Sequence, residues 1–331
     1  MVGQPPLAAL SRAAIALLAM FACFAAPLAH AQDKNLTLPV AELERMLQSE
    51  PMRIVTAEIS RPTAKGGVDI TLKTEAAFGD RLPMRIKLRR AEPGAEAFNN
   101  VPRYDIAAYE LQKLLMNESE YVVPPTALRM MSLAELKPFA PKAKRTFEGA
   151  DEVLCVLQYW LQDVTAPRDV LDQARLASDA RYARHIAQLN VFTYLIRHGD
   201  SNQGNFLISA APEDARVFAI DNGVAFASEP SNRGELWKPM RVERLPVDLV
   251  ERIRGLTEDN LDARLGVLAQ WELEDGRYVA MPLGTNLAPN DGVRRKGAIV
   301  QLGLTRSEIN GVWSQTKRLL RMIESGKVVA Y

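Results

Sequence analysis

The stretch LIRHGDSNQGNFLIS, from Leu195 to Ser209, places polar side chains and glycines between two apolar segments. His198, Asp200 and Asn205 all lie within it. Such a stretch is either an ordinary polar turn or a backbone bent around a chemical site. The sequence on either side of it distinguishes the two.

The flanking segments predict a helix before this stretch and a β-hairpin after it. Residues 179–197 carry apolar side chains at helical spacing. NFLISA and RVFAID, separated by APED, predict two paired strands, with Leu207 roughly opposite Ala219. Asn205 precedes the first strand and Asp221 follows the second, so antiparallel pairing brings both to one end. The preceding loop is expected to bring Asp200 to that end as well.

Three oxygen-bearing side chains would therefore converge at the end of the hairpin. Two of them suit a hard divalent cation, and the third can accept a proton. Phosphoryl transfer needs this combination of metal ligands and a carboxylate beside the attacking hydroxyl. The alternative is a pair of Asx-rich turns that bind nothing. The order and separation of D-x-x-x-x-N at Asp200 to Asn205 and of IDNG at Asp221 favour the functional interpretation.

The first half of the chain supplies candidate partners for a phosphate. PMRIKLRR predicts a strand that directs Lys87 away from the face of its apolar neighbours. Asp105 is expected to be the N-cap of the helix IAAYELQKLL, and Glu110 falls within the apolar stripe of that helix. A buried carboxylate needs a partner, and Lys87 is the candidate. The alternatives are a solvated strand face for Lys87 and a stripe-edge position for Glu110 that reaches water.

Composition restricts the class of protein and the kind of metal site. The 331 residues are 47% hydrophobic and 24% charged with a net charge of +1, which indicates a globular protein and argues against a nucleic-acid binder. The first 31 residues read as a secretory signal peptide cut after Ala31, so we expect an exported, periplasmic or secreted protein without a stable membrane span. Pro27 breaks the apolar run and argues against an anchor. Cleavage would leave one cysteine, Cys155, and two histidines, so a metal would be held by oxygen ligands, as Mg²⁺ or Mn²⁺ is.

The order of predicted elements indicates an α+β fold with two lobes. Strands dominate up to a buried, near-continuous apolar strand at 152–161, and a mostly helical pattern is expected from Leu245 onward. We therefore expect a strand-rich N-lobe over 32–161, ending in a connector, and a helix-rich C-lobe over 162–331 that carries the catalytic and metal-binding loops.

HGDSNQGNFL and AIDNG together resemble the catalytic and metal loops of protein-kinase-like phosphotransferases. The surrounding sequence is similar to the phosphatidylinositol 3-/4-kinase-like group, in the segments AAYELQKLL, VVPPTAL, VLQYWLQ and VFTYLIRHGDSNQGNFLIS. That group includes bacterial relatives of the secreted Golgi casein kinases and four-jointed kinases. The similarity runs from about the strand of Lys87 to Phe226. Its motifs are moderately specific together and weak singly.

The resemblance implies a protein-kinase-like fold that uses ATP with Mg²⁺ or Mn²⁺ to phosphorylate a hydroxyl of a protein or small molecule. Asp200 would be the catalytic base, and Asn205 and Asp221 the metal ligands. The other implied roles belong to the N-lobe. Lys87 would contact the ATP phosphates and pair with Glu110, and the adenine would lie against Gln158 to Trp160.

The chain departs from the pattern of the family in two places. Ser201 and Asn202 stand where many members carry Arg-His, and the only glycines before Lys87 that could form a phosphate loop are Gly66 and Gly67. Two other functions therefore stay open. One is a secreted pseudokinase-like binding module, and the other is a transferase that moves a nucleotide.

Overall fold

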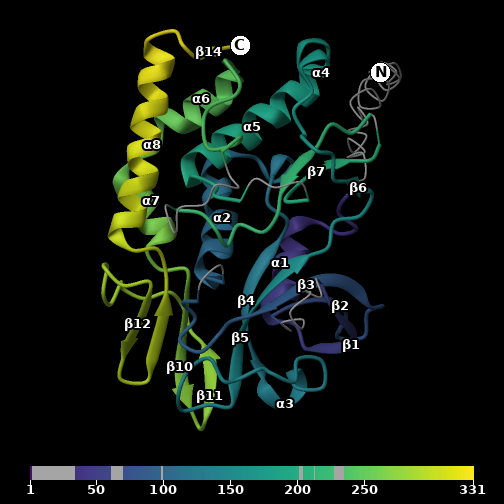
Figure 1. Cartoon of the computed structure of the whole chain (residues 1–331), viewed down its shortest axis with the longest axis vertical. Coiled ribbons are helices and arrows are strands. Elements are labelled where there is room, and N and C mark those ends of the chain that lie inside the picture. Colours follow the sequence, from purple (N-terminus) through teal and green to yellow (C-terminus); the bar gives the residue numbers. More distant parts are fainter. Residues whose placement is uncertain (2–33, 61–69, 98–99, 201–203, 212, 227–234) are drawn as a thin grey trace.

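The computed structural model describes Met1 and residues 34–60, 70–97, 100–200, 204–211, 213–226 and 235–331. The predicted signal peptide, the Gly66–Gly67 segment, Ser201 and Asn202 lie outside the described residues. Within the described part, the fold is mixed α+β, with eight α-helices and mostly antiparallel sheets (Figure 1).

A five-stranded antiparallel sheet forms the first half of the chain, in the order β1-β2-β3-β5-β4. Its strands are β1 (Met52–Ile59), β2 (Thr71–Phe78), β3 (Met84–Arg90), β4 (Thr126–Ser132) and β5 (Glu152–Tyr159). The strands predicted at 83–90 and 152–161 are confirmed, as β3 and β5, to within a few residues at each end.

Helices cover both faces of this sheet because its strands alternate apolar residues to each side. Leu88 and Leu157 share a core with Leu43 and Leu47 of α1 (Val40–Ser49). The opposite face packs with α2 (Pro102–Leu115) into the larger core, which extends through the rest of the chain. The short elements η1 (Glu118–Glu120) and α3 (Leu133–Leu136) flank β4.

The helix before the quoted stretch is confirmed as α5 (Ala180–Ile196). The Asp179 side chain accepts a hydrogen bond from the Tyr182 backbone N–H, which satisfies a free donor at the start of the helix. The helix is buried along nearly its whole length and ends at Arg197, whose φ of 51° turns the chain into the polar loop. Its neighbours are α4 (Gln173–Ser178) and the three-stranded sheet β6 (Val164–Thr165), β7 (Phe206–Ser209) and β8 (Val217–Ala219).

The expectation of a mostly helical pattern after Leu245 is wrong in part. A four-stranded antiparallel sheet, in the order β11-β10-β13-β12, occupies residues 269–302. Its strands are β10 (Ala269–Glu274), β11 (Arg277–Ala280), β12 (Val293–Lys296) and β13 (Ile299–Leu302). These strands carry charged residues on their exposed sides, which hid the short alternating pattern of Trp271, Leu273 and Val300.

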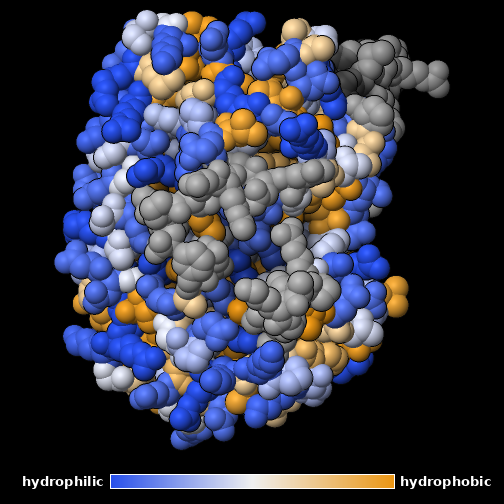
Figure 2. All heavy atoms as spheres, viewed as in Figure 1, coloured by the Kyte–Doolittle hydropathy of each residue, from blue (hydrophilic) through white to orange (hydrophobic). Residues whose placement is uncertain are grey.

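Two helices of this part of the chain start after the threonines Thr257 and Thr305. Each threonine caps its helix with a capping box, at α7 (Glu258–Leu265) and α8 (Arg306–Glu324). The remaining elements are α6 (Val247–Arg254) and the parallel pair β9 (Arg244–Leu245) and β14 (Val329–Ala330). On the face shown in Figure 2, polar side chains intermix with small apolar groups, as the composition suggests for a globular protein.

Among the described residues, no helix combines the length and apolar character needed to cross a membrane.

Candidate active site

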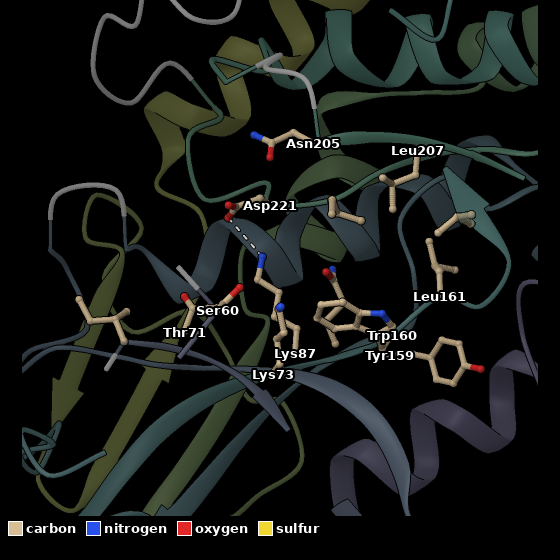
Figure 3. Close-up of a pocket in the computed structure, with 15 residues that line it drawn as sticks. Ser60, Thr71, Lys73, Lys87, Tyr159, Trp160, Leu161, Asn205, Leu207 and Asp221 are labelled. Carbon is tan, nitrogen blue, oxygen red and sulfur yellow. Dashed lines mark ion pairs between the residues drawn. The ribbon is translucent and has the colours of Figure 1, made fainter. Parts of the chain in front are cut away.

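A cavity of about 520 Å³ lies between the five-stranded sheet and the β7–β8 hairpin (Figure 3). Its walls come from β2, β3, the end of β5 and the segment that follows, and the hairpin end. The volume falls within the range of small-molecule and cofactor sites. Five of the seven predicted site residues line it, namely Lys87, Gln158, Trp160, Asn205 and Asp221.

Lys87 faces the cavity because it alternates with the buried Ile86 and Leu88 on β3. Its Nζ lies 3.4 Å from Oδ1 of Asp221, which follows the hairpin's second strand. Figure 3 shows this ion pair bridging the sheet and the hairpin across the cavity. Lys87, followed by Arg89, holds the pKa of the Asp221 carboxyl well below its usual range. Asp221 is therefore ionised at neutral pH, and its side chain is 36% exposed toward the cavity.

The predicted pairing of Lys87 with Glu110 is wrong. Glu110 forms ion pairs with Lys113, at 2.9 Å, and with Arg264 of α7. The helix α2 is buried on most of its circumference, so the apolar stripe did not identify the side that faces β3. Glu110 lies on the side that meets α7. Among the described residues, neither Glu110 nor Asp200 lines the cavity.

Asp105 takes the place on α2 that Glu110 was expected to have. It forms a buried ion pair with Arg89, two residues after Lys87 on the same face of β3. The Arg89 Nη1 also donates a 2.9 Å hydrogen bond to Asp221. Arg89 thus links the helix to the carboxylate of the cavity. The prediction that Asp105 is the N-cap is wrong, because the N-cap is Val101 and the helix begins at Pro102, three residues before Asp105. An acidic residue at the start of the helix was the available signal in the sequence.

The hairpin brings Asn205 and Asp221 to one end, as predicted. Phe206 pairs with Ala219, one residue away from the expected register of Leu207 with Ala219. Asn205 accepts a backbone hydrogen bond from Ile220 at 2.8 Å, so Asp221 follows directly beside it. Asp221 has a φ of 61°, a strained conformation for a non-glycine residue. Such strain is often found at functional sites.

The donor atoms at this end of the hairpin fit a hard divalent cation. The Asn205 Nδ2 donates to the backbone oxygen of Asp200 at 2.8 Å, so its Oδ1 is the atom available to a ligand. Figure 3 shows that oxygen turned toward Asp221. An amide oxygen and a carboxylate are ligands that Mg²⁺ and Mn²⁺ accept, with phosphate oxygens and water completing the coordination. No cluster of three His, Cys, Asp or Glu side chains suited to a metal occurs among the described residues.

The polar loop is tied to the segment after Asp221 by backbone hydrogen bonds. The Gly199 N–H donates to Val224 O at 2.7 Å, and the Phe226 N–H donates to Ile196 O at 2.6 Å. These bonds hold Asp200, the residue after Gly199, beside the loop that carries Asp221. The Asp200 backbone is thus held next to Asn205, although Asp200 is not among the residues that line the cavity.

His198 supports this loop from within the core. It is fully buried, and its Nδ1 accepts a 3.3 Å hydrogen bond from the Asp200 backbone N–H. Burial lowers its pKa to about 4, so the ring is neutral at pH 7. Because Nδ1 is an acceptor, the neutral ring carries its proton on Nε2. This is the structural role expected for a lone histidine.

Gln158 and Trp160 bound the cavity at the end of β5. The Gln158 Nε2 donates to Thr126 Oγ1 at 3.0 Å, which fixes its side chain against β4. The Trp160 backbone N–H donates to Arg85 O at 3.2 Å, and its ring lies along the cavity wall (Figure 3). An aromatic face of this kind can stack on a planar heterocycle.

The sequence reasoning missed Lys73. It pairs directly with Lys87 across β2 and β3, and both line the cavity. Two like charges opposite each other are unfavourable unless an anion accompanies them. The Lys73 Nζ lies 3.5 Å from Glu58, which is largely exposed. Alternation along VDITLKTE could have placed Lys73 on the same face as Lys87.

No family model matches this chain, and no curated protein matches it.

Proposed function

We propose that this protein transfers the γ-phosphoryl group of ATP to a hydroxyl of a protein or small-molecule substrate. The observation that carries the proposal is the cavity in which Lys87 of β3 meets Asp221 beside Asn205, with the end of β5 as a third wall. A lysine for phosphates, oxygen ligands for a cation and an aromatic wall for a base are the parts that phosphoryl transfer uses. The proposal includes a two-lobed, protein-kinase-like arrangement of the five-stranded sheet and the rest of the chain.

Each residue has a stated role in this proposal. Lys87 binds the phosphates, and Trp160 and Gln158 border the adenine. Asn205 and Asp221 hold Mg²⁺ or Mn²⁺, which when bound neutralises phosphate charge. Asp200 accepts the proton of the attacking hydroxyl.

Arg89 and Asp105 form the support of this site in place of Glu110. Arg89 holds the Asp221 carboxylate from the side of the sheet, and Asp105 holds Arg89 to α2. A side chain positioned by buried partners keeps its geometry when the ligand arrives. The protein acts after export, in keeping with the predicted signal peptide.

Incubation of the full chain with ATP labelled at the γ-phosphate, Mg²⁺ or Mn²⁺, and a panel of proteins and small alcohols tests this function. Labelled product that disappears with Asp221→Asn and Asp200→Asn supports it. Asp275→Asn is the matched control, because Asp275 also has a positive φ, of 47°, and lies in an exposed turn. A parallel incubation with ATP labelled at the α-phosphate, giving labelled product where the γ-label gives none, would instead indicate nucleotide transfer. No metal-dependent product with any acceptor would argue against the enzyme.

One observation favours a second candidate, a binding module that retains nucleotide affinity without turnover. Both Lys87 and Arg89 contact the Asp221 carboxylate, so a cation must compete with two positive charges. Nucleotide binding that does not depend on Mg²⁺ or Mn²⁺, together with no labelled product, would support this module.

A further inference from the structure

A second cavity, of about 420 Å³, lies at the β4 edge of the five-stranded sheet. It runs between β4 and the β10–β11 hairpin, and the helices α1 and α2 close it at one end. Tyr109 Oη and Lys113 Nζ both contact Glu44 Oε1 at 2.6 Å, which joins the two helices there. The cavity is therefore a groove with one closed end.

One wall of the groove is the free edge of β4. This strand is the last in the sheet, and it pairs only with β5. The Tyr159 N–H donates to Pro125 O, which fixes the hydrogen-bonding alternation of the pair. By that alternation, the backbone groups of Leu128 and Met130 point away from β5. Both residues line the groove.

The facing wall is the free edge of β11, the last strand of the four-stranded sheet. The Met281 N–H donates to Gln270 O, so the backbone groups of Tyr278 and Ala280 point away from β10. The Tyr278 N–H donates to Glu152 Oε2 of β5 at 2.6 Å, which shows that this edge faces the five-stranded sheet. The backbone groups of Ala280 are directed to the groove. Two strand edges thus face one another across a cavity.

The side chains of the groove differ between its two faces. Leu128, Met130 and Trp271 belong to the apolar core on the α2 side. Arg129 alternates with Leu128 and Met130 along β4 and therefore lies on the α1 side. Its Nη1 is buried without a hydrogen-bond partner among the described residues. Burial lowers the pKa of Arg129, and Glu135 only partly offsets this.

Apolar residues continue to the rim of the groove. Met281 is 36% exposed and Leu283 is 58% exposed, and both line the cavity. Exposed apolar side chains at the rim of a cavity often mark a contact surface.

We propose that this groove binds an extended peptide segment of another protein, which adds a strand between β4 and β11. Main-chain hydrogen bonds to the two free edges would supply affinity, as in other strand-addition sites. Because side chains alternate along a strand, an acidic residue facing Arg129 would be flanked by apolar residues facing Met130 and Trp271. The recognised pattern is apolar-acidic-apolar. This site is independent of the proposed phosphoryl transfer, since the residues that line it and those that line the first cavity have no member in common.

Fluorescence polarisation with labelled peptides tests the proposal on the full chain. The panel is Ac-Thr-X-Asp-X-Thr-amide, with X as Val, Leu, Phe or Tyr, together with copies in which Lys replaces Asp or the amides of X are N-methylated. We expect saturable binding of at least one Asp peptide below about 1 mM. Arg129→Met and the Lys peptides should each weaken it about tenfold or more, because a charge-assisted hydrogen bond is lost. Arg277→Met, on the same hairpin but exposed, should change it less than about twofold.

Two further measurements separate strand addition from other modes. N-methylation should abolish binding, and Ala280→Pro should weaken it, since proline at an edge removes only the outward N–H. Circular dichroism checks that this variant folds. Amide exchange at Leu128, Met130 and Ala280 should slow when the peptide binds. The proposal is overturned if no peptide of the panel saturates, or if N-methylated peptides or the Arg129→Met variant bind as tightly. The proposal would also be overturned if a simple fatty carboxylate at Arg129 were the one compound that displaced the peptide, and amide exchange at Leu128, Met130 and Ala280 were not slowed.

Discussion

Replacing Arg89 by methionine should destabilise the protein by about 3–5 kcal/mol, because it leaves the buried carboxylate of Asp105 without a partner. The side chains of Arg89 and Asp105 are only 6% and 3% exposed. The second partner of Arg89, Asp221, keeps Lys87 and is partly exposed, so its share is at most about 1 kcal/mol. The double variant Arg89→Met/Asp105→Leu should recover most of the loss, since it removes both charges.

Urea unfolding followed by tryptophan fluorescence measures these free energies in a double-mutant cycle. The matched cycle uses Lys73→Met and Glu58→Gln, whose side chains are 43% and 73% exposed. We expect a coupling free energy of several kcal/mol for the buried pair and below about 1 kcal/mol for the exposed pair. Equal coupling in the two cycles would refute the account of Arg89 as the buried link between α2 and the cavity.

Three further predictions concern single residues. His198→Asn should remove part of the loss of stability in acid. The pKa of His198 is near 4 in the folded protein and about 6.5 in the unfolded chain, so the free energy of unfolding falls as pH drops from 6.5 to 4, by at most roughly 3 kcal/mol. Urea unfolding at pH 7 and 4.5 measures this fall, and a fall of the same size in the variant would contradict the prediction. Glu110→Gln should leave the ATP-induced rise in melting temperature intact. If a thermal-shift measurement found that the variant had lost this rise, Glu110 would belong to the nucleotide site after all. Gly223→Ala should lower the free energy of unfolding, measured in urea, by about 1–3 kcal/mol, because the added Cβ would lie 2.9 Å from the Arg89 Nη1. Gly311→Ala is the control, since its Cβ meets no atom within 4 Å. Equal stability of the two variants would argue against a fixed Arg89.

The hairpin and the strand of Lys87 could be predicted from the sequence because short-range alternation determines both. Strand alternation directs Lys87 to the cavity, and the short turn brings Asn205 and Asp221 to one end. The one-residue error in register did not matter, because both residues lie just beyond the strands. Local patterns of this kind depend little on the rest of the fold.

The partner of Lys87 could not be predicted because it depends on how two distant elements pack. Periodicity predicts a helix over 106–115, which the structure extends back to Pro102, but it does not predict which side of a largely buried helix meets β3. Asp105 and Glu110 differ by five residues and hence by more than one turn, and only the packing of α2 against α7 separates them. The four-stranded sheet was missed for a related reason, since its strands are short and their exposed residues are charged.

The central claim, that Lys87, Asn205 and Asp221 form a site for a nucleotide with a divalent cation, is tested most directly by thermal shift. ATP with Mg²⁺ or Mn²⁺ should stabilise the full chain by about 2.7 kcal/mol at one hundred times the Kd. The account predicts that Asp221→Asn or removal of the metal largely abolishes this shift, while Asp275→Asn retains it. An equal shift in Asp221→Asn, or none with ATP and either metal in the unaltered chain, would contradict the account.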